Sequence, residues 1–442
     1  MFKKSFIAAL LSVGIISSTT AQVFNKAKMD SFFTAIERNN KGMGSVAITK
    51  NGKVVYTRSI GYSYINAYTK THADYATKYR IGSITKMFTT TMIFQLIEEG
   101  KLTLNTPLAK FFPKIPNAKL ITIGNLLNHR SGIHNFTKDA DYLLWNGKAH
   151  TQSEMVAIIT KGGSDFTPDS QATYSNSNFV LLGFIVEKIT GKTYEEALEQ
   201  RITSKIGLTN TYYGGKTNLS NREAFSYSLD SNWTQEPETD MSIPGGAGAI
   251  LSTPVELDLF ISNLFMNKLI KPASLEQMKT IKDKYGMGMF QVPFGTKKGY
   301  GHTGGIDGFS SSLGYFPEDS VAIAYCNNGV VYPTNDIMIG ALSIYFDKPY
   351  NIPTFKAYNV TPVELNQFAG VYSSTQIPLK ITITVQGNTL TGQATGQTAF
   401  PLEATEKNTF QFQTAGIVLI FNPEKNEMTL KQGSIFLFTK EK

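Results

Sequence analysis

The stretch YRIGSITKMFTTTMIFQLIEEGKL, residues 79–102, decides the fold of this chain. It predicts a short extended segment, a turn at Gly82 and an amphipathic helix that ends at Gly100. Ser83 and Lys86 are three residues apart at the start of this helix, so their side chains share one face. A Ser hydroxyl reacts as a nucleophile when a neighbouring base removes its proton, and a Lys can be that base when its pKa falls. Burial and the positive end of a helix both lower a Lys pKa, so the pair is a candidate catalytic site.

A second polar motif, YSN at residues 174–176, directly precedes another helical pattern. From a loop at this place the Tyr174 phenol and the Asn176 amide can project into a site. The same residues also suit a capping turn, in which Ser175 or Asn176 accepts hydrogen bonds from helix N–H groups. Because the chain is rich in Ser and Lys, an S-x-x-K pair also arises by chance, so neither motif is specific alone.

A third motif, GHTGG at residues 301–305, places His302 and Thr303 between glycines at the edge of a strand pattern. Such glycines let a substrate approach the backbone closely, although the motif also suits a tight turn with a solvated His. The remaining histidines lack the paired spacing of a metal site, so we expect no metal. They are His72, His129, His134 and His150.

Length and composition indicate a globular protein. With 442 residues, 41% of them hydrophobic, the chain can form a large core and is long enough for two or three domains. Residues 1–21 combine Lys3 and Lys4 with a short apolar stretch and small residues that end at Ala21, as in a secretory signal peptide. We therefore expect a periplasmic or secreted protein with no lipid anchor and no membrane span after cleavage.

The charged residues and the single cysteine exclude further classes. The formal charge is +8, but the basic residues are scattered, so we expect no nucleic-acid partner. Cys326 is the only Cys, which rules out an intramolecular disulfide and a Cys-based metal site, and its apolar surroundings indicate a core residue.

The order of patterns predicts one mixed unit with strands at both ends. An opening helix at 25–39 is followed by two alternating strands that meet at a hairpin turn, Asn51 and Gly52. Helical patterns dominate from Thr85 to about Phe265, strands return at about 285–326, and a closing helix is expected at 334–346. We predict that this unit occupies residues 22–350.

The C-terminal part has a different pattern. A segment with several prolines, residues 351–365, is predicted to be a linker. Residues 366–442 alternate strongly between apolar and polar, as at Ile381, Ile383 and Val385, which predicts a small all-β module, a barrel or a sandwich.

Taken together, the three motifs resemble those of a known enzyme family. An S-x-x-K, then a Y-x-N roughly ninety residues later, then an H-T-G on a late strand resemble the signatures of serine enzymes that act on penicillins and D-alanyl peptides. Because the middle motif begins with Tyr, the chain most resembles the class C β-lactamase and DD-peptidase-like family. LLNHRSGI at 126–133 and IPGGAGAILSTPVELDLF at 243–260 are also similar to that family, and the resemblance covers about residues 25–347.

The resemblance implies an α+β fold of the β-lactamase/transpeptidase type. This fold has an antiparallel sheet flanked by helices and a mainly helical subdomain, and the C-terminal module is similar to lipocalin-like appendages. Ser83 would be the acylated nucleophile, Lys86 its base or the charge that lowers the Tyr174 pKa, and Tyr174 the proton carrier. The amides of Ser83 and Gly305 would form the oxyanion hole. The implied substrate-binding residues are Asn176, His302, Thr303, Gly304 and Gly305.

One departure from the family pattern bears on the substrate. Typical β-lactamases of this class carry Lys at the position of His302, and a neutral His attracts a substrate carboxylate less. The resemblance therefore favours a DD-carboxypeptidase or DD-peptidase that needs no cofactor and acts on a small-molecule or peptide substrate such as a peptidoglycan fragment.

Of three alternative functions, one stays open and two are disfavoured by the sequence. An esterase or D-amino-acid amidase of the same family is the main alternative. A non-catalytic penicillin- or peptidoglycan-binding protein is disfavoured because all three motifs are intact. A Ser-His-Asp esterase is disfavoured because the chain has no G-x-S-x-G motif.

Overall fold

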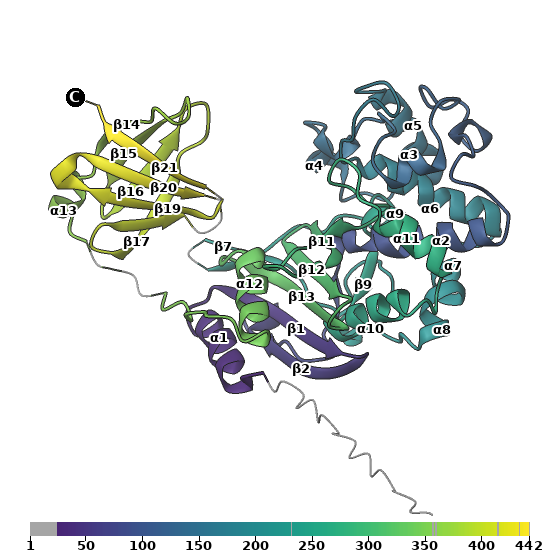
Figure 1. The fold of residues 1–442 in the computed structure, drawn as a ribbon, viewed down its shortest axis with the longest axis horizontal. Coiled ribbons are helices and arrows are strands. Elements are labelled where there is room, and N and C mark those ends of the chain that lie inside the picture. Colours follow the sequence, from purple (N-terminus) through teal and green to yellow (C-terminus); the bar gives the residue numbers. More distant parts are fainter. Residues whose placement is uncertain are drawn as a thin grey trace, which may run out of the picture.

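The computed structural model describes residues 24–441 except 231, 356, 357, 359, 413, 414 and 433. The predicted signal peptide, residues 1–21, lies outside the described residues. The described chain forms a larger unit that ends near Phe355 and a C-terminal β-barrel (Figure 1).

The larger unit is built on a six-stranded sheet in the order β10-β11-β12-β13-β1-β2, and every neighbouring pair is antiparallel. The sequence predicted strands at both ends of this unit, and the structure shows that β1 from one end pairs with β13 from the other. Asn51 and Gly52 have φ of 53° and 70°, so they form the expected two-residue hairpin turn between β1 and β2. The strands are β1 Gly42–Lys50, β2 Lys53–Ile60, β10 Phe290–Gln291, β11 Tyr300–Ile306, β12 Phe309–Phe316 and β13 Val321–Val330.

Helices cover both faces of this sheet. On one face α1, Lys26–Arg38, and α12, Thr334–Tyr345, pack their apolar sides against the strands. On the other face α10, Pro254–Phe265, lies over β1 and β13 (Figure 1). The buried positions of α1 recur with the three-to-four spacing of an amphipathic helix, which explains its place at the surface.

Helix α2, Thr85–Glu98, lies at the centre of the helical region. The sequence predicted an amphipathic helix, but every residue from Thr85 to Leu96 is buried, because α6, α7, α9 and α10 enclose it. The other helices are α3 Ile123–Leu127, α4 Tyr142–Trp145, α5 Gln152–Gly162, α6 Asn176–Thr190, α7 Tyr194–Leu198, α8 Ser204–Ile206, α9 Gly245–Gly248 and α11 Pro272–Lys279. Short strands complete the unit: β3 Tyr62–Ile65, β4 Lys70–His72, β5 Tyr79–Arg80, β6 Tyr212–Tyr213, β7 Tyr227–Leu229, β8 Trp233–Gln235 and β9 Ile250–Ser252.

The C-terminal module is a closed antiparallel barrel in which β14 pairs with β21. Ile381 and Ile383 point into its apolar core, as their alternation predicted. The predicted linker ends in a short helix, α13 Pro362–Asn366, whose Leu365 lies in the barrel core. The strands are β14 Gly370–Ser373, β15 Lys380–Gln386, β16 Thr389–Ala394, β17 Phe400–Glu406, β18 Thr409–Phe412, β19 Ile417–Asn422, β20 Glu427–Gln432 and β21 Ser434–Lys440.

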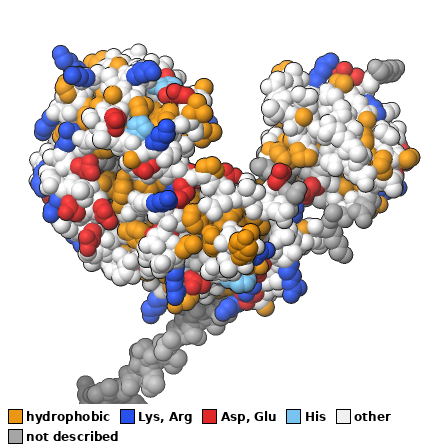
Figure 2. Space-filling view, turned by 180° about the vertical axis from the view of Figure 1, so that it is seen from behind, with side chains coloured by type: hydrophobic (Ala, Val, Ile, Leu, Met, Phe, Trp, Pro, Cys, Tyr) orange, Lys and Arg blue, Asp and Glu red, His pale blue; other side chains and the backbone are white. Residues whose placement is uncertain are grey.

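The surface shows no gathering of basic side chains on the face drawn in Figure 2, where Lys and Arg are interspersed with Asp and Glu. None of the helices in the described ranges is both long and apolar enough to cross a membrane. Within the same ranges, no group of three or more His, Cys, Asp or Glu residues is arranged to hold a metal ion. Cys326 is fully buried in β13, as expected of a core residue.

Candidate active site

Ser83, the predicted nucleophile, lies on a single 3-10 turn, Gly82–Ile84, between β5 and α2. Gly82 has φ of 49°, and a Cβ at this position would meet the backbone N of Gly305 at 2.8 Å. Only Gly fits this close approach, which holds the turn against β11. Ser83 and Gly305, whose amides would form the oxyanion hole, therefore come from adjacent segments and line the same cavity.

Lys86 is fully buried beneath Ser83. Its Nζ lies 2.9 Å from Ser83 Oγ, 2.8 Å from Asn176 Oδ1 and 2.8 Å from the Ala247 carbonyl oxygen. Burial lowers the pKa of the Lys86 amine well below its ordinary value, so the neutral form is favoured. A neutral amine has two N–H groups and one lone pair, and an amide or carbonyl oxygen can only accept. The two N–H groups therefore go to Asn176 and Ala247, which leaves the lone pair facing the Ser83 hydroxyl.

Tyr174 completes the group around the nucleophile. Its hydroxyl donates to Ser83 Oγ at 2.7 Å, and Lys86 Nζ lies 4.9 Å from the centre of its ring. Burial raises the pKa of the Tyr174 phenol, so it stays protonated at neutral pH. Of the two roles that the resemblance implied for Lys86, this geometry supports the base, because the buried pair is most stable when both groups are neutral.

Asn176 is the first residue of α6 and ties the site to a neighbouring loop. Its backbone N–H donates to Asn135 Oδ1 at 3.0 Å, and its side-chain Nδ2 donates to Thr137 Oγ1 at 3.1 Å. The amide nitrogen is thus held by Thr137, which leaves the amide oxygen to face Lys86. Asn176 also lines the cavity, so it can contact a substrate as the resemblance implied.

The residues of the third motif lie in different places. His302 is 2% exposed, packs against the Phe290 ring at 4.4 Å between centroids, and does not line the cavity. Burial lowers its pKa to about 3, so it presents no charge to a substrate at neutral pH. Thr303 and Gly304 also lie outside the cavity lining, whereas Gly305 is part of it. A Cβ on Gly304 would come within 2.0 Å of the Ile81 carbonyl oxygen, so this glycine serves the packing of β11 beside the nucleophile.

A cavity of about 450 Å³ opens beside Ser83. Much of its wall is apolar, and the only acidic residues in the lining are Glu236 and Asp307. No Lys, Arg or His belongs to the lining. The lining residues are Gly82, Ser83, Phe136, Thr137, Tyr142, Leu143, Asn146, Asn176, Glu236, Pro237, Thr239, Pro244, Ala247, Gly248, Gly305, Ile306 and Asp307.

His129 supports the site although the sequence suggested no role for it. It is 2% exposed, its ring packs 4.5 Å from that of Tyr174, and its Nδ1 accepts a hydrogen bond from the Ser175 N–H at 3.2 Å. The signal that could have identified His129 is its position within LLNHRSGI, a stretch similar to the family. Asn135 and Thr137 follow the same stretch of sequence, and the sequence suggested no role for them either.

The chain is similar to known proteins over most of the larger unit. The family model described as Beta-lactamase matches residues 32–340. The chain is 29% identical over 270 residues to the putative penicillin-binding protein PbpX of Bacillus subtilis, covering 60% of this chain and 66% of that protein. It is 26% identical over 287 residues to the teichoic acid D-alanine hydrolase of Staphylococcus aureus, covering 62% of this chain and 69% of that protein.

Two solved structures are similar over longer stretches. The D-amino acid amidase from Ochrobactrum anthropi SV3 has a TM-score of 0.63 and 25% identity, with 72% of this chain and 99% of that chain covered. The octameric penicillin-binding protein homologue from Pyrococcus abyssi has a TM-score of 0.67 and 26% identity, with 94% of this chain and 100% of that chain covered.

Proposed function

Since this chain belongs to the beta-lactamase family and is a serine hydrolase, we propose that it cleaves D-aminoacyl esters or amides through an acyl-enzyme on Ser83. The observation that carries the proposal is the placement of Lys86 Nζ and the Tyr174 hydroxyl within hydrogen-bond distance of Ser83 Oγ. The D configuration and the aminoacyl group are suggested by the names of the similar hydrolase and amidase.

Acylation follows from the positions of these three side chains. Ser83 Oγ attacks the substrate carbonyl carbon while Lys86 Nζ takes the hydroxyl proton. The amides of Ser83 and Gly305 stabilise the negative charge that forms on the carbonyl oxygen. The bond to the leaving alcohol or amine then breaks, and the Tyr174 hydroxyl supplies the proton that the leaving group needs. The proton held by Lys86 restores the Tyr174 phenol, so both groups are again neutral.

Deacylation uses the same groups with water as the nucleophile. Water attacks the ester carbonyl on Ser83, gives one proton to the Lys86 and Tyr174 pair, and the proton returns to Ser83 Oγ as the ester bond breaks. Each cycle consumes one water molecule and releases the amino acid and one alcohol or amine.

The cavity lining favours esters and amides over the DD-carboxypeptidase substrates that the sequence suggested. A DD-carboxypeptidase substrate ends in a carboxylate, and a carboxylate is best bound by a cation. The cavity lining contains no cationic side chain, and His302 is neutral and buried. The location outside the cytoplasm stays part of the proposal and rests on residues 1–21 alone.

The test is acyl-enzyme trapping on a chain that begins at residue 22. We expect D-alanine esters and D-alaninamide to be hydrolysed faster than their L forms, and rapid quenching to show a D-alanyl adduct by intact mass. Peptide mapping should place the adduct on Ser83, and Ser83→Ala should lose both adduct and turnover, by at least roughly 10³-fold. Ser204→Ala, at an exposed serine on α8, is the matched control. An adduct on another residue, or turnover confined to acylated D-Ala-D-Ala peptides, would contradict the proposal.

A further inference from the structure

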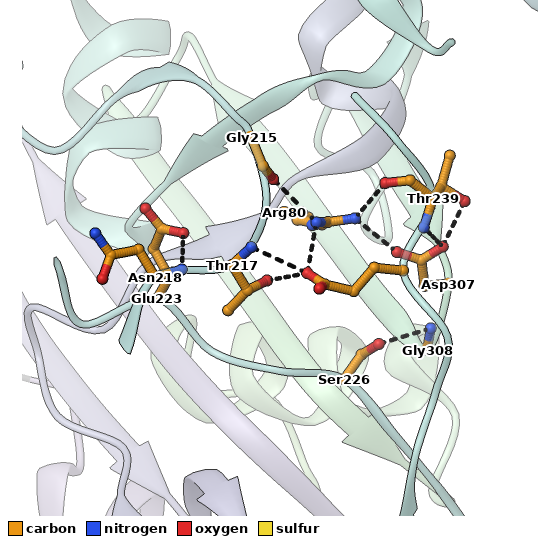
Figure 3. Close-up of polar contacts among 10 residues, drawn as sticks. Arg80, Gly215, Thr217, Asn218, Glu223, Ser226, Thr239, Asp307 and Gly308 are labelled. Carbon is orange, nitrogen blue, oxygen red and sulfur yellow. Dashed lines mark hydrogen bonds and ion pairs between the residues drawn. The ribbon is translucent and has the colours of Figure 1, made fainter. Parts of the chain in front are cut away.

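Two acidic residues, Glu236 and Asp307, line the cavity. Asp307 pairs with the buried Arg80 (Figure 3), which also pairs with Glu238 outside the lining. Arg80 is 2% exposed and lies three residues before the nucleophile, at the end of β5. A carboxylate that is already paired with Arg80 is less available to bind a substrate than one that is not paired.

Asp307 and Glu238 are both engaged. Asp307 accepts from Arg80 Nη1 at 3.0 Å, from the Thr239 N–H at 3.1 Å and from the Thr239 hydroxyl at 2.6 Å. Glu238 accepts from Arg80 Nη2 at 2.7 Å and from the Thr217 N–H at 3.1 Å. Arg80 also donates to the carbonyl oxygens of Thr239 and Gly215 (Figure 3). Arg80, which lies outside the cavity lining, therefore pairs with two carboxylates and is not available to a substrate.

Glu236 is different. It lines the cavity and is partly exposed, and its carboxylate makes no hydrogen bond or ion pair with any residue that the structure describes. Its backbone is fixed, because its N–H donates to the Ser226 carbonyl at 2.8 Å. The Ser226 hydroxyl accepts from the Gly308 N–H at 3.1 Å, as Figure 3 shows, and a Cβ on Gly308 would come within 3.0 Å of Glu236 Cγ. The Glu236 side chain thus lies over the turn between β11 and β12, where Gly308 leaves room for it.

We propose that Glu236 selects substrates that carry a free ammonium group, an inference that rests on the proposed function. The cavity offers such a substrate one uncommitted carboxylate and no competing cation, together with an apolar wall that raises the strength of a charge interaction. An aminoacyl ester or amide with an unblocked amine is cationic at neutral pH, whereas its N-acetylated form is neutral. Glu236 therefore favours the unblocked acyl group and disfavours carboxylate-bearing substrates by repulsion.

The experiment compares D-alaninamide with N-acetyl-D-alaninamide on three proteins, each beginning at residue 22. In the parent protein the unblocked amide should have the lower KM, and added NaCl should raise that KM because salt screens the interaction. Glu236→Gln should raise the KM for the unblocked amide about 10-fold, with kcat within about twofold, and leave the KM for the N-acetyl amide unchanged. Glu199→Gln, at an exposed carboxylate outside the cavity lining, controls for the loss of one negative charge and should change neither KM.

The possible failures are distinguishable. An equal change for both amides in Glu236→Gln, or no change, would overturn the role of Glu236 while turnover in the parent protein still supported the proposed function. Absence of turnover of both amides and of a D-alanine ester, with Ser83 still labelled by a fluorophosphonate, would overturn the proposed function and this inference together.

Discussion

At the scale of single residues, Lys86 is the side chain on whose ionisation the proposed acylation depends. Burial holds its pKa well below the value that it has in the unfolded chain. Between these two pKa values the unfolded chain binds a proton on this amine that the folded chain does not bind, so stability rises with pH across that window. Activity should rise with pH in the same direction, because only the neutral amine can accept the Ser83 proton.

We therefore predict two effects of Lys86→Met. The value of kcat/KM should fall by about 10² to 10⁴-fold, as expected for the loss of a general base. The free energy of unfolding should also lose a slope of up to about 1.4 kcal/mol per pH unit in the window below the ordinary Lys pKa of about 10.4. Urea unfolding of both proteins at several pH values measures the slope. Equal slopes would show that Lys86 is charged in the folded protein.

The sequence predicted some of these residues better than others. Ser83, Lys86, Tyr174 and Asn176 lie in motifs with local spacing, and the structure brings all four together. The sequence contained no motif around Glu236, because its proposed role depends on a fold that places it beside residues distant in sequence. His302 stood in a recognisable motif, but its burial by the Phe290 ring could not be read from the motif.

At the scale of elements, the turn that carries the nucleophile is fixed by its contact with β11. We predict that Gly82→Ala lowers the free energy of unfolding by about 2 to 5 kcal/mol, because a Cβ here combines left-handed strain with a collision against the Gly305 backbone. It should also reduce kcat/KM in the fraction that stays folded, because Gly305 must move. Urea unfolding and active-site titration with a fluorophosphonate measure both effects.

Gly100 offers a matched control at the other end of α2. It has φ of 72°, but a Cβ there would meet nothing within 4 Å. Gly100→Ala should therefore cost only the strain, about 1 to 2 kcal/mol, and leave kcat/KM unchanged. If both variants lost the same stability and kept full activity, the contact between Gly82 and β11 would have no role in the site.

Elements with a strong local signal were predicted well. The β1–β2 hairpin followed from Asn51 and Gly52, and the barrel strands followed from alternation. The complete burial of α2 was not predicted, because the number of helices that enclose a helix depends on tertiary packing. The helix α13 was missed within the predicted linker, although Thr361 and Glu364 form a capping box, a signal the sequence contains.

At the scale of the whole molecule, the larger unit and the barrel have separate apolar cores. Tyr350, Ile352 and Phe355 pack against the core of the larger unit, so this unit extends beyond the predicted boundary at residue 350. We predict that a chain of residues 22–355 folds cooperatively and keeps fluorophosphonate labelling of Ser83. A chain of residues 22–348, which lacks the three apolar side chains, should have a lower Tm. Calorimetry and labelling test both chains, and an unfolded 22–355 chain would show that the barrel is required for folding.

The buried Lys86 also bears on the history of this chain. A folded domain is stable by only about 5 to 15 kcal/mol, and burying an amine so that its pKa falls well below the ordinary value costs part of that margin. A lineage that had given up hydrolysis and kept the fold only to bind a ligand would gain stability from mutations that replace this lysine, so drift would soon remove it. A fully enclosed lysine aimed at an intact serine is thus an arrangement that selection for turnover would maintain and selection for binding alone would not.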